Sequence, residues 1–203
     1  MKLSTKSPKS YPCFQELTKA HLLSRFVLQQ PPEPVHFKHF LPKRMSAVLI
    51  PIISRDERLS VLLTRRSETL RHHAGQICFP GGRCDPEDQD EVQTALRETH
   101  EEIGLQPQEI QILGKLPGRG TRTQFHITPI VGLIEQEYAL RLNHTEVSEA
   151  FEVPLHVLRQ QLPPFKKNHH LGPYPSFIWH HHLIWGATAG LLEECLQLFS
   201  EPC

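Results

Sequence analysis

Three glutamates stand close together near the middle of the 203-residue chain. Glu98, Glu101 and Glu102 are spaced i, i+3 and i+4, and in an α-helix this spacing places them within an arc of about 100°. Clustered carboxylates repel one another, and hard divalent cations with oxygen ligands offset that repulsion. The spacing therefore predicts a site for Mg²⁺ or Mn²⁺, ions that bridge phosphate oxygens and lower the pKa of bound water. Hydrolysis of a diphosphate requires both effects.

The alternative is a solvated helix face with ordinary charge pairs, which would be favoured if the glutamates stood alone. Their context favours chemistry, because Gly81-Gly82 and the acidic turn at 83–88 lead directly into the predicted helix. Arg97 adjoins the glutamates and can hold one of them in a ligating rotamer. A separate apolar face of the same helix, suited to packing on a sheet, contains Val92, Ala95, Leu96, Thr99 and Ile103.

A basic segment precedes the glycines. Arg65, Arg66 and Arg71, with His72 and His73, give five potential phosphate donors within nine residues. A substrate with several phosphates would suit this segment. The alternative is a surface loop whose arginines pair with neighbouring acids.

The glycine loop and the acidic helix together resemble the Nudix box, G-x5-E-x7-R-E-U-x-E-E-x-G-U, where U is a bulky apolar residue. The matching positions are Gly82, Arg97, Glu98, Glu101, Glu102, Gly104 and Leu105. Thr99 stands where an aliphatic residue is usual, and Asp88 stands where the early glutamate belongs, with eight residues instead of seven before Arg97.

The resemblance implies roles and a fold. Glu98, Glu101 and Glu102 become metal ligands, with Glu101 and Glu102 also catalytic, and Arg97 becomes their orienting partner. The implied fold is α/β (α+β), a Nudix α/β/α sandwich with a mixed central sheet. Nudix enzymes often use a loop carboxylate as an additional ligand or general base. Glu146, in a predicted loop, is the candidate here, although loop glutamates are usually only solvated.

Residues 62–82 are similar to the signature LLTxRS-x3-R-x3-G-x3-FPGG of the coenzyme A diphosphatase branch of Nudix hydrolases, and every fixed position matches. The resemblance extends from about Met45 to Phe199. It implies hydrolysis of coenzyme A or a derivative to 3′,5′-ADP and 4′-phosphopantetheine. The substrate-binding candidates that it gives are Arg66, Ser67, Arg71, Gly75 and Phe79.

Two other functions remain open at this point. One is a Nudix hydrolase for another nucleoside diphosphate derivative, which the basic segment disfavours. The other is an inactive Nudix-fold ligand sensor, which would not need an intact set of glutamates. The oligomeric state is open between monomer and homodimer.

Two further groups of residues are ambiguous. His180, His181 and His182 could suggest a metal site, but in a continuous strand adjacent side chains point to opposite faces, so strand packing or surface placement is expected. Arg119 and Arg122 flank Gly120 in a predicted loop that could reach a phosphate or be a plain exposed turn.

Composition limits the remaining classes of function. The chain has 22 basic and 22 acidic residues, so no global field recruits nucleic acid or anionic membrane. Five scattered cysteines without a CxxC spacing fit neither a disulfide framework nor a zinc knuckle. The first residues contain lysines without an apolar run behind them, and no later run approaches a membrane span. We therefore expect a protein of the reducing cytoplasm.

The elements that must position these residues follow from periodicity. We expect an N-terminal helix at 14–29 and a proline-rich linker, with 1–44 preceding a hydrolase domain at 45–200. Strands at 45–53 and 59–64 should pair as a hairpin. The remaining expected strands are 109–116, 125–134 and 177–185. The remaining expected helices are 88–105, 154–161 and 187–199.

Overall fold

The computed structural model describes residues 17–28, 44–56, 58–120, 125–162, 165–169 and 172–198. Its helices are α1 (Lys19–Leu28), α2 (Glu91–Ile103), the 3₁₀ helix η1 (Pro107–Glu109), α3 (Leu155–Arg159) and α4 (Gly186–Leu198). The strands of the larger sheet are β1 (Arg44–Arg55), β2 (Arg58–Arg66), β3 (Ile77–Cys78), β4 (Gly81–Arg83), β5 (Gln111–Lys115), β6 (Arg119–Gly120), β7 (Phe125–Ile134) and β8 (Val147–Pro154). A smaller sheet contains β9 (Phe165–His169), β10 (Gly172–Trp179) and β11 (His182–Trp185).

The larger sheet is mixed. Its strands follow the order β3-β2-β1-β7-β5, while β4 pairs with β1, β6 with β7 and β8 with β2. The β1–β7 pair is parallel, and the other pairs of this sheet are antiparallel. The predicted hairpin is confirmed, since β1 and β2 pair in register from Ile52 opposite Val61 to Arg55 opposite Arg58.

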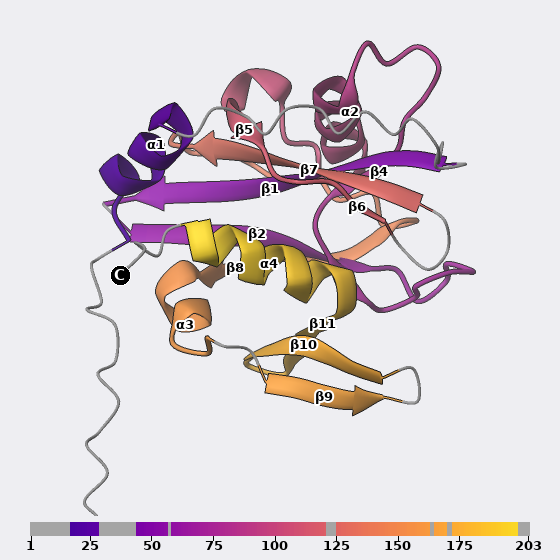
Figure 1. The fold of residues 1–203 in the computed structure, drawn as a ribbon. Coiled ribbons are helices and arrows are strands. Elements are labelled where there is room, and N and C mark those ends of the chain that lie inside the picture. Colours follow the sequence, from indigo (N-terminus) through magenta and orange to yellow (C-terminus); the bar gives the residue numbers. More distant parts are fainter. Residues whose placement is uncertain are drawn as a thin grey trace, which may run out of the picture.

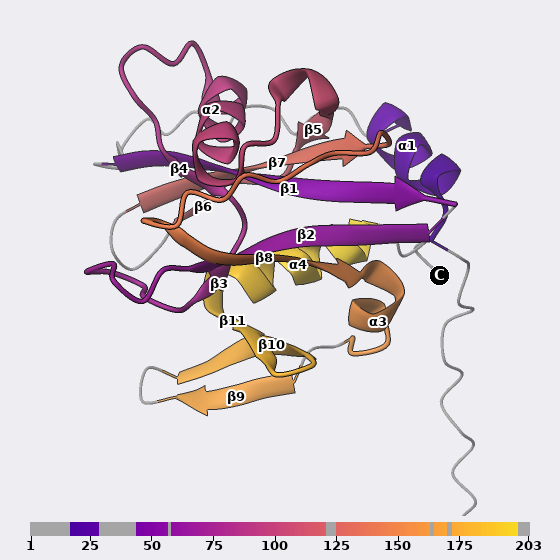
Figure 2. The ribbon, with the colours of Figure 1, turned by 180° about the vertical axis from the view of Figure 1, so that it is seen from behind.

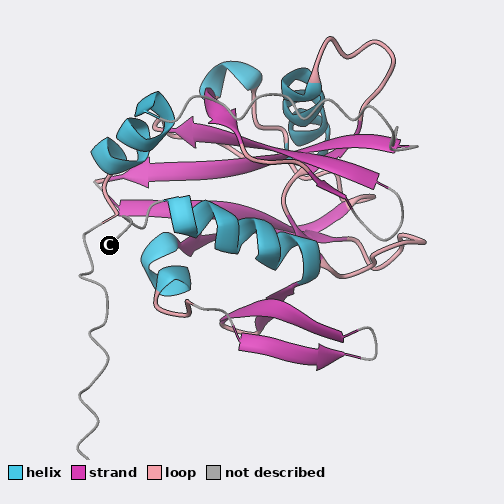
Figure 3. Cartoon of the chain, in the orientation of Figure 1, coloured by secondary structure: helices cyan, strands magenta, loops and turns pink. Residues whose placement is uncertain are grey.

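Helices cover both faces of this sheet, as Figures 1 and 2 show from opposite sides and Figure 3 shows by secondary structure. The α2 helix lies on one face, and α3 and α4 lie on the other. The strand β1 contributes side chains to the packing on both faces, because its alternate residues point to opposite sides. Leu49 belongs to the core cluster that contains Ala95 of α2, whereas Ile50 belongs to the cluster that contains Leu192 of α4. The predicted α/β/α sandwich with a mixed sheet is confirmed.

Helix boundaries differ from the expected ones where caps end the helix. The predicted helix at 88–105 is observed as α2, which starts after Asp90, whose side chain accepts a hydrogen bond from the Gln93 backbone N–H. It ends at Gly104, whose φ of 76° is the left-handed conformation that terminates many helices. Within 109–116, the predicted strand begins only after η1.

The prediction of one strand at 177–185 is wrong. The segment forms two antiparallel strands, β10 and β11, with Trp179 opposite His182. His180 and His181 make the turn between them, and His180 has a φ of 52°. Because two of the three histidines form a turn, strand alternation does not determine where their side chains point. The strand β8 was not expected; it begins at Val147, directly after Glu146.

The N-terminal helix packs on the domain. Leu22 of α1 is fully buried in the core cluster shared with β2 and α4, and Phe26 lies against Gly114 of β5. Residues 14–16 and 29 of the predicted helix, and the linker before Arg44, lie outside the described residues. The division of the chain at residue 44 stays a prediction. Among the described residues, no helix has the length and apolar character needed to cross a membrane.

Candidate active site

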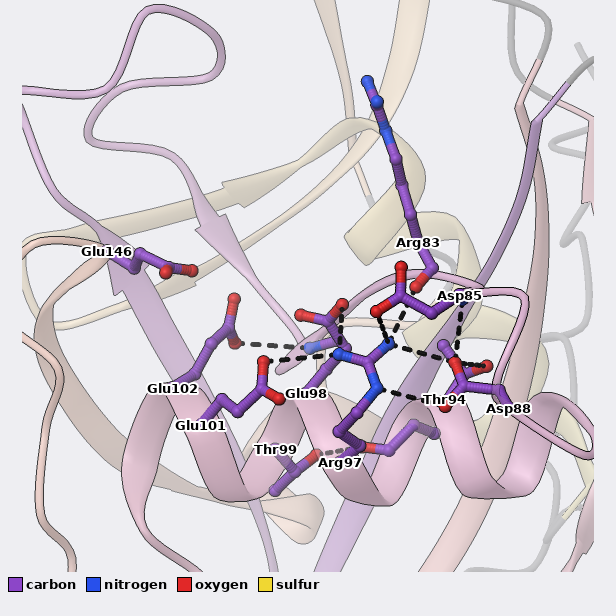
Figure 4. Close-up of polar contacts among 12 residues, drawn as sticks. Arg83, Asp85, Asp88, Thr94, Arg97, Glu98, Thr99, Glu101, Glu102 and Glu146 are labelled. Carbon is purple, nitrogen blue, oxygen red and sulfur yellow. Dashed lines mark hydrogen bonds and ion pairs between the residues drawn. The ribbon is translucent and has the colours of Figure 1, made fainter.

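The three glutamates project from one side of α2 while its other side packs on the sheet (Figure 4). Ala95, Thr99 and Ile103 are fully buried on the sheet side. The Thr99 hydroxyl donates to the Ala95 carbonyl oxygen at 2.6 Å. This internal hydrogen bond satisfies the hydroxyl, so threonine can occupy an apolar position.

Two consecutive glycines bring β4 against the carboxylates. The Gly81 backbone N–H donates to Glu102 Oε2 at 3.2 Å. A Cβ at Gly81 would lie 2.4 Å from the Ala47 carbonyl oxygen, and one at Gly82 would lie 2.3 Å from the carboxyl carbon of Glu98. Side chains at these two positions would therefore displace either the strand or the acidic residues, which explains the need for glycine.

Arg97 connects the acidic groups of the helix and its preceding loop (Figure 4). Its guanidinium donates to both carboxylate oxygens of Asp88, from Nε at 3.1 Å and from Nη2 at 3.0 Å. Its Nη1 donates to Glu98 at 3.1 Å and to Glu101 at 3.3 Å. The Thr94 hydroxyl also donates to Asp88, at 2.8 Å. The shifted position of Asp88 thus still supplies a carboxylate to Arg97.

Burial changes the electrostatics of two glutamates. Glu102 is 2% exposed, and its burial raises its pKa to about 8, with the Gly81 N–H and Arg66 acting in the opposite direction. Burial likewise raises the pKa of Glu98, while Arg97 opposes that rise. Glu146 raises the pKa of both by repulsion. In the absence of a cation, burial and repulsion therefore favour the protonated form of both groups.

These residues fit a hard divalent cation. Glu98, Glu101 and Glu102 supply only carboxylate oxygens, the ligand type that such ions prefer. Arg97 holds two of the three, and the N–H of Gly81 holds the third, so hydrogen bonds already orient the carboxylates. A bound cation would offset the repulsion that raises the pKa of Glu98 and Glu102.

Arg66 reaches the site from the end of β2. Its Nη1 lies 3.8 Å from Glu102 Oε1, and its side chain is 27% exposed. The Nε atom of Arg66 is buried and has no hydrogen-bond partner within the part of the chain that the structure describes. An arginine beside the carboxylates thus keeps one buried donor for an acceptor that the described residues do not provide.

The loop after Arg66 also contacts the segment of Glu146. The Ser67 N–H donates to the Glu146 carbonyl oxygen at 2.8 Å. The Glu146 side chain points toward Glu102 in Figure 4, and it accepts a hydrogen bond from Asn143 Nδ2 at 3.3 Å. The loop after β2 and the segment before β8 therefore meet beside the glutamates of α2. Asn143, which the sequence did not single out, positions the Glu146 side chain.

The other candidates on this loop have different environments. Arg71 is exposed. Gly75 has a φ of 65° and its N–H donates to the Arg66 carbonyl oxygen at 3.2 Å, so it closes the loop in a conformation that favours glycine. Phe79 is 3% exposed and belongs to the core. Its burial in the core therefore anchors the end of the segment that carries the signature.

Some ambiguous residues lie elsewhere. Arg119 forms an ion pair with Glu194 of α4, and Arg122 lies outside the described residues. Cys78, Cys84 and Cys195 are free thiols.

The chain is similar to known proteins in sequence and in fold. The sequence matches the family described as NUDIX domain over residues 43–174. The protein named "Uncharacterized Nudix hydrolase NudL" from Photorhabdus laumondii is 39% identical over 189 residues, with 89% of this chain and 97% of that protein covered. Its namesake from Yersinia pestis is 38% identical over 193 residues, with 89% and 94% covered.

Solved structures show a similar fold. A C. elegans Ap4A hydrolase superposes with a TM-score of 0.53 at 17% identity, covering 76% of this chain and 95% of the other. A NUDIX hydrolase from Alicyclobacillus acidocaldarius gives 0.51 at 18% identity, covering 77% and 92%. At these identities the likeness concerns the fold alone.

Proposed function

The chain belongs to the NUDIX domain family, and within that family we propose that it hydrolyses the diphosphate linkage of coenzyme A or a coenzyme A derivative. Family membership makes it a Nudix-type diphosphatase that acts on a nucleoside diphosphate derivative with the help of divalent metal ions. We propose the identities of the substrate, the metal and the site residues from the contacts described above.

One observation carries the choice of substrate. The segment 62–82, which resembles the coenzyme A diphosphatase signature, lies against Glu98 and Glu102. Arg66 at its start lies beside Glu102, and the Gly81 N–H at its end donates to the same carboxylate. Ser67 is joined to the segment of Glu146 by a backbone hydrogen bond. The signature therefore forms one wall of the site, where it can contact whatever occupies it.

The charges of this wall suit a substrate with several phosphates. Arg66 has a buried Nε without a partner among the described residues, so a phosphate oxygen is a chemically suitable acceptor. Arg71 is exposed on the same loop and free to meet a second anionic group. Coenzyme A has a 3′-phosphate besides its diphosphate, so it offers two separate anionic groups. We assign Arg66, Ser67, Arg71 and Gly75 to substrate binding, with Phe79 supporting the loop.

In the proposed reaction a water molecule attacks one phosphorus of the diphosphate, and the bond from that phosphorus to the bridging oxygen breaks. The products are 3′,5′-ADP and 4′-phosphopantetheine, or its acyl form. Glu98, Glu101 and Glu102 would hold Mg²⁺ or Mn²⁺, which activates water and neutralises charge on the departing phosphate. Arg97 keeps Glu98 and Glu101 in place. Glu146 is the carboxylate that we assign to accept the proton of the attacking water, and Glu101 and Glu102 contribute to catalysis through the ion that they would hold.

A panel of substrates tests this proposal. The purified full chain is incubated with coenzyme A, NADH, ADP-ribose and a nucleoside triphosphate, each with Mg²⁺ or Mn²⁺, and kcat/KM is compared. The proposal predicts the highest value for coenzyme A. Faster turnover of another compound would retain the Nudix chemistry and refute the substrate. Absence of turnover for all four would favour an inactive ligand sensor.

A further inference from the structure

A second cluster of metal-binding side chains lies outside the site described above. It consists of Glu149 on β8, His181 in the β10–β11 turn and His182 at the start of β11. One carboxylate oxygen and one imidazole nitrogen from each histidine lie within 4.8 Å of one another. We propose that these three residues bind a transition-metal ion of the zinc type, which fastens the β10–β11 turn to β8.

This cluster is separated from the catalytic glutamates by the sheet. Phe151, two residues after Glu149 on β8, packs against the core cluster that contains Leu192 of α4, whereas Ala150 packs against the cluster that contains Ala95 of α2. Alternate residues of a strand share a face, so Glu149 and the glutamates of α2 occupy opposite faces. The placement of β10 and β11 on the side away from α2 agrees with this (Figures 1 and 2). The two sites thus cannot share one ion.

The central ligand is held rigidly. His182 is 6% exposed, and its ring stacks on Phe151 with centroids 4.0 Å apart and planes 5° from parallel. Glu149 and Phe151 are two residues apart on β8, so both face His182. His182 Nε2 lies 3.4 Å from Glu149 Oε1. Zinc bonds of about 2.0–2.1 Å at tetrahedral angles separate two donors by about 3.3 Å, so this pair already has the required spacing.

The third ligand can adjust to complete the set. His181 is exposed and lies in the turn, where its ring centroid is 4.0 Å from that of His182. Rotation of an exposed side chain costs little, and it can close the remaining separation. Two imidazoles and one carboxylate form a ligand set that proteins use for zinc, with water in the fourth position.

The charge environment is compatible with a cation. Arg65, which lies opposite Glu149 in the β2–β8 register, is a positive side chain that would repel a cation. Its guanidinium forms an ion pair with Glu68 at 2.8 Å, which offsets part of that charge. Glu149 adds the negative charge that a dication needs.

Spectroscopy with Co²⁺ distinguishes this site from the carboxylate site. Co²⁺ bound in a four-coordinate site with imidazole ligands gives stronger d–d absorption than six-coordinate Co²⁺ on oxygen ligands. Chelator-treated full chain is titrated with Co²⁺, and Zn²⁺ is then added to displace it. His181→Ala removes a ligand from an exposed turn, and His180→Ala is the matched control because His180 is an adjacent exposed histidine outside the cluster.

We expect the four-coordinate spectrum in the wild-type protein and in His180→Ala, and at least about tenfold weaker Co²⁺ binding in His181→Ala. Zn²⁺ should raise Tm by about 5 °C in the first two proteins and by less in His181→Ala. Glu149→Gln should resemble His181→Ala. Only six-coordinate Co²⁺ in the wild-type protein, or equal Co²⁺ affinity in the two histidine variants, would overturn the proposal. None of these readouts depends on which diphosphate is hydrolysed.

Discussion

Arg97 donates to both carboxylate oxygens of Asp88 from across a helix terminus, at 3.1 and 3.0 Å. The Asp88 side chain is 4% exposed, and the arginine side chain is 26% exposed. The same guanidinium contacts Glu98 and Glu101. Because the arginine is held by Asp88, its contacts with the glutamates are fixed before any ligand arrives. Asp88 therefore takes the place of the early glutamate of the Nudix box, although its side chain is shorter and one more residue separates it from Arg97.

This pair predicts a specific acid sensitivity of folding. The hydrogen bonds from Arg97 lower the pKa of Asp88 below its ordinary value of 3.8. A depressed folded-state pKa contributes stability that is complete above 3.8 and is lost as the pH falls through the folded pKa. Asp88→Asn should therefore reduce the free energy of unfolding by about 2 kcal/mol at pH 7. The difference from the wild-type protein should shrink as the pH falls below 3.8.

Urea denaturation at a series of pH values measures this effect. Asp85→Asn is the control, since Asp85 is an exposed aspartate 3.7 Å from the same guanidinium. Its expected cost at pH 7 is below about 0.5 kcal/mol. A constant difference between Asp88→Asn and the wild-type protein at all pH values would contradict the predicted linkage.

Gly82 predicts a loss of activity that exceeds the loss of stability. A Cβ at this position would lie 2.3 Å from the carboxyl carbon of Glu98, and the flexible glutamate must move away. Displacement of a catalytic group by about 1 Å costs on the order of 100-fold in rate. Gly82→Ala should therefore lower kcat/KM by about that factor while the protein remains folded, as judged by Tm and circular dichroism.

Gly120→Ala is the matched control, because a Cβ there meets no atom within 4 Å. It should leave kcat/KM and Tm close to the wild-type values. Full activity of Gly82→Ala would mean that the position of Glu98 next to β4 is unimportant for turnover.

Arg66 predicts a defect in substrate binding. Replacement of Arg66 by Met removes the buried Nε donor and the positive charge beside Glu102. Hydrogen bonds to charged groups contribute about 1.5–3 kcal/mol, so kcat/KM for coenzyme A should fall roughly 10- to 100-fold. Arg58→Met, at the exposed opposite end of β2, should have little effect. Equal kinetics of the two variants would remove Arg66 from the substrate site.

Glu102 predicts a loss of catalysis without unfolding. In Glu102→Gln the amide oxygen can still accept the Gly81 N–H, and a neutral amide removes the burial cost that raises the pKa of the acid to about 8. We expect kcat to fall by more than about 100-fold. Loss of a residue that only hydrogen-bonds to a metal ligand already lowers activity about 10- to 100-fold, and loss of a ligand should have a larger effect. Tm should not fall by more than a few degrees.

Glu87→Gln removes an exposed carboxylate just before the helix and serves as the control. It should retain wild-type turnover. Unchanged kcat in Glu102→Gln, measured with saturating Mg²⁺, would show that Glu102 is not a ligand.

The sequence predicted the parts of this molecule that local periodicity determines. The spacing of Glu98, Glu101 and Glu102 defined α2, and the apolar run of β1 defined a strand that is buried on both faces. The separation of the glutamates from the sheet-facing residues of α2 also followed from helical geometry. These features need only the residues of one element.

Contacts between distant segments were not predictable in this way. The hydrogen bond from the Ser67 backbone N–H to the Glu146 carbonyl oxygen joins two loops that are far apart in the sequence, and no local sequence pattern predicts it. The glycines of β4 offer no alternation of side chains, and β8 has Glu149 and Glu152 among its residues, so it lacks the regular apolar alternation that indicates a strand. The turn at His180 lacks the glycine or asparagine that usually marks a φ above zero, so one strand was expected where two exist.

We propose that the glutamates of α2 direct metal-dependent cleavage of coenzyme A. The most direct test incubates the wild-type protein and Glu101→Gln with coenzyme A and Mg²⁺, Mn²⁺ or a chelator, and identifies the products by mass. We predict 3′,5′-ADP and 4′-phosphopantetheine from the wild-type protein with either metal, and neither product with the chelator or with Glu101→Gln. Intact coenzyme A in the presence of both metals, or equal cleavage by the variant, would contradict the claim.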